Sequence, residues 1–187
     1  MTKLLTLKHW QLFGLMIGVM LISSFFDIAT SQIAWAISML LFVAVYFGWF
    51  WAMGINLYHK LPPNTNMNLS RFKLFLFIPV VYIAIISFIF GGISVGTQGD
   101  STGGYSAIIV PIHLFSMFCI FWCLAFVAKS LKAIKLQRPV TFSDYAGEFF
   151  LIWFFPIGVW IIQPRINKIF DSTVSADNNQ ILDNNTQ

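Results

Sequence analysis

The segment Ile33–Tyr58, IAWAISMLLFVAVYFGWFWAMGINLY, runs for 26 residues without a charged side chain. A helix needs about 20 predominantly apolar residues to cross the hydrocarbon core of a bilayer. This run exceeds that length, so it predicts a transmembrane helix. It also decides the class of fold, because shorter apolar runs occur in the cores of soluble proteins and uncharged runs of this length do not.

Three further apolar runs lie at residues 10–26, 72–95 and 108–128. Of the 187 residues, 58% are hydrophobic and 10% are charged, and the mean hydropathy is +0.77. These values exclude a soluble domain, which carries about 25% charged residues, and they exclude a disordered chain. The first run could be a secretory signal peptide, but no small-x-small cleavage site follows it closely, which favours a retained anchor. The sequence predicts an all-α integral membrane protein with four transmembrane helices, built as one bundle by residues 1–170.

The basic residues indicate the orientation of this bundle. Nine Lys and Arg flank the predicted helices on one side of the membrane, and the alternate connections, residues 27–32 and 96–107, hold none. Because Lys and Arg are retained in cytoplasmic segments, we expect both termini in the cytoplasm and a multi-pass protein of the cell inner membrane. Cations at helix ends indicate topology and attraction to anionic lipids of the cytoplasmic face, not a nucleic-acid partner. The nine are Lys3, Lys8, Lys60, Arg71, Lys73, Lys129, Lys132, Lys135 and Arg138.

The last apolar segment, residues 149–162, differs from the other four. As a straight helix its 14 residues would reach only about 21 Å, short of a hydrocarbon core of about 30 Å. Pro156 and Gly158 interrupt it, and a full crossing would carry Arg165 and Lys168 to the outer side. We therefore predict a re-entrant or interfacial broken helix, with a short fifth span as the alternative.

The prediction for the C-terminal part has three components. The broken helix covers residues 144–170, with Thr141 or Ser143 as its N-cap. Pro164 disfavours helix at the residue before it. The polar, Asn-rich residues 171–187 are expected to form a disordered cytoplasmic tail.

The predicted helices contain little that resembles catalytic chemistry. None holds an Asp, Glu, Lys or Arg in its interior, which weakens a proton-driven mechanism. His113 is expected to hydrogen bond to a neighbouring helix, with a ligand or catalytic role as the alternative. Cys119 and Cys123 share a helix face but lack the spacing of a zinc site, so no metal and no cofactor are expected. Asp144 and Glu148 favour helix initiation, although a carboxylate pair at this spacing could hold a cation.

These observations favour a non-enzymatic accessory or regulatory protein that acts through partners at the membrane. The alternative is a small oligomeric pore or a carrier of lipid-like or apolar solutes, since broken helices at membrane depth line cavities or are buried in protein. Gly14 and Gly18 could pack the first helix on the second or form a homo-oligomer interface. A protein partner in the membrane or cytoplasm is also expected. The candidate binding residues are His113, Pro156, Gly158, Gln163 and Arg165.

Overall fold

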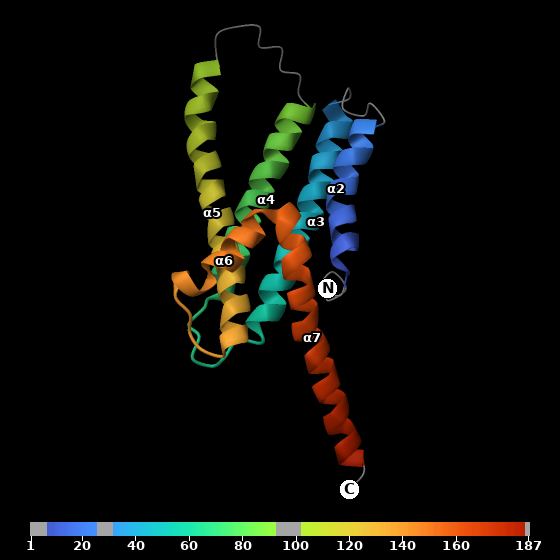
Figure 1. Cartoon of the computed structure of the whole chain (residues 1–187). Coiled ribbons are helices and arrows are strands. Elements are labelled where there is room, and N and C mark those ends of the chain that lie inside the picture. The colour runs from blue at the N-terminus through green and yellow to red at the C-terminus, as the bar shows by residue number, and fades with distance from the viewer. Residues whose placement is uncertain (1–6, 26–31, 93–101, 186–187) are drawn as a thin grey trace.

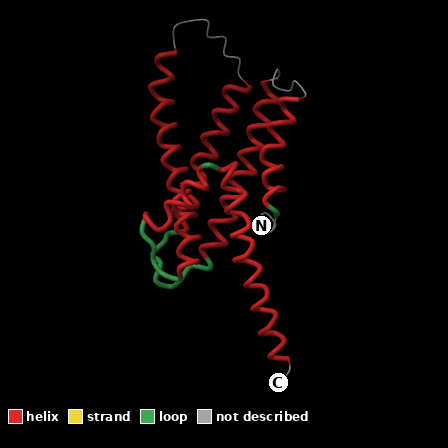
Figure 2. Tube along the Cα trace, in the orientation of Figure 1, coloured by secondary structure: helices red, strands yellow, loops and turns green. Residues whose placement is uncertain are grey.

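The structure is a computed structural model that describes residues 7–25, 32–92 and 102–185, and the described residues form α-helices joined by turns and loops. The longer helices run roughly along one common direction, and a short helix near the C-terminus crosses it just before the chain folds back (Figure 1). Figure 2 shows the loops gathered mainly at one end of the bundle. The helices are α2 (His9–Phe25), α3 (Gln32–Tyr58), α4 (Leu69–Gly92), α5 (Thr102–Leu136), α6 (Phe142–Trp153) and α7 (Phe155–Asn185).

Three of these helices contain segments long and apolar enough to cross a membrane, and they support a multi-pass membrane protein. The segments are Ile37–Tyr58, Leu69–Ser87 and Ala107–Leu136. Large apolar side chains on them face outward, for example Phe77 and Leu114, each 63% exposed. A large exposed apolar surface is unfavourable in water, and lipid tails would cover it in a membrane. The first predicted helix is present as α2, but its 17 residues reach only about 26 Å.

The boundaries of the predicted spans are close to those of the helices, with one clear extension. The last three residues of the predicted 72–95 span lie outside the described residues. Helix α5 runs eight residues beyond the predicted end at Ala128. The basic stripe formed by Lys129, Lys132 and Lys135 is therefore helical. The α3–α4 and α5–α6 connections lie at the same end of the bundle (Figure 1). Most of the basic residues lie in these connections or in the adjoining helix ends, so we call this the basic end.

The densely packed core lies towards the basic end. Trp49 and Phe72 are fully buried there, and the Phe72 ring stacks on Phe126 with centroids 4.5 Å apart. Helix α3 contacts α2, α4 and α5, while α6 packs on α5 and α7 packs on α2. The α6–α7 pair packs against the other four helices in this half of the bundle, and this packing buries the core there.

Helices α6 and α7 are bent by 120° at a single residue, Phe154. The amide of Gly158 donates to the Phe154 carbonyl at 2.9 Å, which closes the first turn of α7 immediately after the bend. Pro156 lies in that first turn, where a missing N–H costs nothing. A Cβ on Gly158 would overlap the Leu151 carbonyl oxygen of α6, so only glycine permits this approach. The bent pair confirms the predicted broken helix, and α7 returns to the basic end (Figure 1).

Pro164 was expected to disfavour helix at Gln163, but α7 continues through both residues. A proline inside a helix removes one hydrogen bond, but tertiary packing can outweigh this loss. Here Ile162 and Ile166, on either side of the proline, are both fully buried. Proline also lies inside α4 at Pro79 and inside α5 at Pro111.

The tail also differs from its prediction as a disordered segment, since α7 extends to Asn185. Between Pro164 and Asn185 the sequence contains neither proline nor glycine, so no residue in this stretch breaks a helix that has already been nucleated. The distal part of α7 projects from the basic end, away from the bundle (Figure 1).

The small-residue face of α2 makes no close backbone contact. A Cβ added at Gly14 or at Gly18 would meet nothing within 4 Å among the described residues. Helix α2 instead buries Leu12 and Met16 in the core. The expected packing of the first helix on the second therefore does not use the glycine pair.

Candidate functional site

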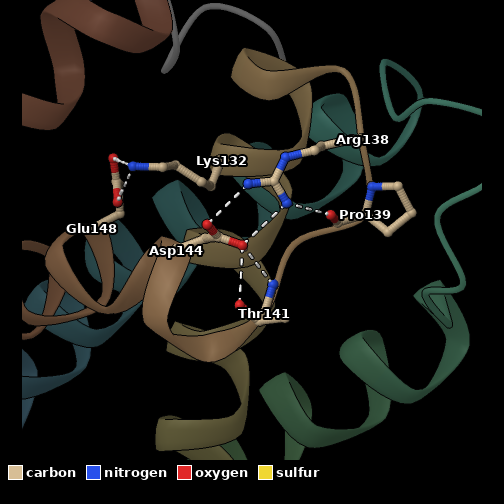
Figure 3. Close-up of polar contacts among 6 residues, drawn as sticks. All are labelled: Lys132, Arg138, Pro139, Thr141, Asp144 and Glu148. Carbon is tan, nitrogen blue, oxygen red and sulfur yellow. Dashed lines mark hydrogen bonds and ion pairs between the residues drawn. The ribbon is translucent and has the colours of Figure 1, made fainter.

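A buried carboxylate joins the helix pair to the bundle. Glu148 of α6 is 6% exposed, and its Oε1 lies 3.3 Å from Lys132 Nζ of α5 (Figure 3). The same oxygen lies 3.4 Å from Arg165 Nη1 of α7. One carboxylate thus connects three helices. Because two cations share it, this ion trio keeps a net positive charge.

A second polar cluster lies within the core on α7. Gln163 is fully buried, and its Oε1 accepts a hydrogen bond from Trp49 Nε1 of α3 at 3.0 Å. Its Nε2 donates to the Leu7 carbonyl at 3.0 Å and to Asn167 Oδ1 at 3.2 Å. Asn167 Nδ2 also donates to the Leu7 carbonyl, at 3.4 Å. Buried amides are costly unless bonded, so this cluster fixes α7 to α3 and to the segment preceding α2.

A pocket of about 310 Å³ opens beside the ion trio, between α5 and α7. We call it the hairpin pocket. Its wall combines cations, one carboxylate and apolar side chains, and three of its residues carry positive charge against one negative charge. It therefore favours an anionic group that also has an apolar part. The lining residues are Leu131, Ile134, Lys135, Glu148, Arg165, Lys168 and Ile169.

The start of α6 is held by a surface cluster (Figure 3). The Asp144 carboxylate accepts from the backbone N–H of Thr141 at 2.9 Å and from its hydroxyl at 3.0 Å. Asp144 Oδ1 also accepts from Arg138 Nη2 at 3.1 Å. These bonds confirm Thr141 as the N-cap and Asp144 as a helix-initiating residue. Glu148 does not share a partner with Asp144 and instead forms ion pairs with Lys132 and Arg165.

The structure brings together some of the candidate residues predicted from the sequence. Three of them lie in the α6–α7 pair. Gly158 permits the close approach of the two helices, the buried amide of Gln163 bonds to α3, and Arg165 pairs with Glu148 of α6. Pro156 is the second residue of α7 and is exposed. His113 stands apart, since it precedes Lys132 by about 28 Å along α5. Its Nδ1 lies 3.1 Å from Tyr82 Oη, so the expected bond to a neighbouring helix is present.

The remaining polar and thiol groups do not form a metal site within the described part of the chain. Cys119 and Cys123 are buried, unpaired and packed between helices. Cys123 Sγ lies 3.9 Å from the Phe72 carbonyl of α4, which is a packing contact for a small buried thiol.

Three residues of the site were not among the candidates from sequence. Trp49 lies in an uninterrupted apolar run and carries no pattern that marks a hydrogen-bond donor. Glu148 is a carboxylate on a mainly apolar helix, and this was a usable signal for a buried charge. Lys132 is indistinguishable by sequence from its neighbours in the basic stripe, because only the folding of α6 onto α5 selects it.

No protein-family model, no curated protein and no solved structure matches this chain. The function is therefore argued from the site alone.

Proposed function

We propose that this chain is a non-enzymatic accessory or regulatory protein of the inner membrane that binds a protein partner through its basic end. In this proposal both termini are cytoplasmic, and α6 and α7 form a re-entrant hairpin that enters and leaves the membrane on that side. The clustering of Lys and Arg in and beside the α3–α4 and α5–α6 connections supports this orientation. The observation that carries the proposal is the hairpin pocket, placed beside an ion trio that fixes its walls.

The pattern of polar bonding supports binding over catalysis. The polar groups in the hairpin are committed to partners within the protein, since Gln163 bonds to Trp49 and Glu148 pairs with Lys132 and Arg165. A preorganised wall of this kind can present charge to a partner without rearranging. In contrast, Lys135 and Lys168 are exposed at its rim. A partner segment with acidic and apolar side chains fits this combination.

The proposal predicts that Lys135→Gln/Lys168→Gln reduces recovery of a crosslinked partner from native membranes by about tenfold, because two rim charge pairs contribute roughly 0.5–1 kcal/mol each. Partner recovery is measured by quantitative mass spectrometry of the affinity-purified, crosslinked chain. The matched control is Lys8→Gln/Lys73→Gln, which removes the same charge from exposed residues outside the pocket. Equal recovery of the same partners by both double variants would contradict the proposal.

A second function, carriage of a lipid-like solute, is favoured by a different observation. A groove of about 490 Å³ lies between α4 and α5, and its lining is apolar apart from Tyr82. Ile85 lines this groove, whereas Leu114 is exposed elsewhere on α5.

If the chain carries such a solute, Ile85→Trp should slow the movement of a fluorescent phospholipid between liposome leaflets, because the larger side chain fills the groove. Leu114→Trp is the control and should leave the rate unchanged. The carrier function is excluded if vesicles with the wild-type chain and empty vesicles give the same rate.

A further inference from the structure

A second pocket at the basic end, of about 340 Å³, lies apart from the hairpin pocket. We call it the loop pocket. It is formed by the α3–α4 connection, the start of α4, the middle of α5 and the first turns of α6. Its charged and polar lining groups come from Asn66, Asn68, Arg71, Lys129 and Tyr145.

The charge of the loop pocket is entirely positive. Arg71 and Lys129 line it, and no carboxylate does. Within the described residues neither cation makes an ion pair, whereas Lys132, Arg138 and Arg165 each do. Two cations that face one cavity repel each other, and an anion placed between them removes that repulsion.

The neutral polar groups of the pocket suit the same anion. Asn68 Oδ1 accepts from the backbone N–H of Arg71 at 3.0 Å, so it caps α4 and fixes the position of Arg71. The carboxamide nitrogen of Asn68 is a hydrogen-bond donor that this cap does not use. The Asn66 carboxamide and the Tyr145 hydroxyl supply further donors to an oxyanion. A phosphate group accepts several such bonds at once and pairs well with guanidinium.

The deep wall of the loop pocket is aromatic. Trp122 stacks on Phe126 with centroids 5.8 Å apart, and Trp122 also packs edge-on against Phe75 at 4.9 Å. Phe126 in turn stacks on the buried Phe72. This wall is apolar and fixed, and it lies on α5 just before the basic stripe begins. Indole rings at this level of a helix are typical of the membrane–water interface.

We infer that the loop pocket binds the phosphate group of an anionic phospholipid, with the phosphate between Arg71 and Lys129 and the adjoining apolar part of the lipid against Trp122 and Phe126. This inference rests on the proposed function in one respect, because the proposed function places the basic end at the membrane surface. A soluble phosphate ester shares the phosphate chemistry but has no apolar part to cover the aromatic wall. The lipid is therefore the better fit.

The test measures lipids that remain bound to the purified full-length chain by native mass spectrometry, after exchange into detergent containing phosphatidylglycerol. Arg71→Gln/Lys129→Gln should lower phosphatidylglycerol retention by about tenfold or more, because the phosphate loses both of its charged partners in the pocket. Arg71→Lys keeps the charge and should retain most of the binding. The control is Lys8→Gln/Lys73→Gln, which removes equal charge from exposed residues outside both pockets and should retain wild-type binding.

Three results would overturn the inference. An equal loss in the two double variants would show charge attraction without a site, and no loss in either would show that the loop pocket is not used. Displacement of the lipid by millimolar glycerol 3-phosphate would assign the pocket to a soluble ester. Partner recovery is measured on the same preparations. A wild-type chain that recovers its partner but retains no phosphatidylglycerol contradicts this inference alone, and a wild-type chain that retains the lipid but recovers no partner contradicts the proposed function alone.

Discussion

Gly158→Ala is expected to separate α7 from α6 and to lower the free energy of unfolding by about 3 kcal/mol or more. Overpacking costs about 1–3 kcal/mol where side chains can move aside. Here a Cβ would overlap the carbonyl oxygen of Leu151 and lie 3.4 Å from Ile152 Cα, and both belong to the backbone of α6. The strain cannot be relieved by a rotamer change, so the bend itself has to open.

This loss is measured as the thermal unfolding midpoint of the purified chain in detergent, where we expect a fall of roughly 6–12 °C. Gly147→Ala is the matched control, because it makes the same substitution in the same helix pair and its Cβ would meet nothing within 4 Å. It should leave the midpoint unchanged or raise it, since alanine favours helix over glycine by about 0.5–1 kcal/mol. Equal midpoints for the two variants would refute the role of Gly158.

The sequence located the break in the C-terminal segment but not its angle or direction. Pro156 and Gly158 mark the break because each has a local effect on the backbone that any fold must respect. The bend occurs at Phe154, two residues before the proline, because Pro156 is accepted in the first turn of α7. The direction depends on the contact between Gly158 and Leu151, which exists only after α6 and α7 have packed together.

The site was harder to predict because its contacts join distant parts of the chain. Gln163 and Arg165 stood out as polar residues beside a broken helix, and both are part of the site. Their partners could not be read from local pattern, since Trp49 precedes Gln163 by 114 residues. The same reason explains the error at Pro164, where buried neighbours on either side outweigh a local preference that the sequence shows clearly.

Glu148→Gln is expected to lower the free energy of unfolding by about 2 kcal/mol, which is less than the 3–5 kcal/mol typical of a broken buried ion pair. The expected loss lies below that range because the side chains of Lys132 and Arg165 are 22% and 45% exposed and keep part of their hydration. The glutamine fills the same space, so the loss reports charge and not packing. Chemical denaturation in detergent micelles, followed by tryptophan fluorescence, measures it.

Asp144→Asn provides the comparison at an exposed pair, where Arg138 and Asp144 are 54% and 24% exposed. Its cost should be clearly smaller than that of Glu148→Gln, because a surface ion pair contributes little and asparagine retains part of the cap.

A second variant, Lys132→Met/Glu148→Met, removes one cation together with the carboxylate and leaves Arg165 able to reach water. Because replacing a buried ion pair by apolar residues is often neutral, this variant should recover most of the stability that Glu148→Gln loses. If it is instead the less stable of the two, Glu148 holds the hairpin by packing, and the ion trio is not what fixes the pocket wall.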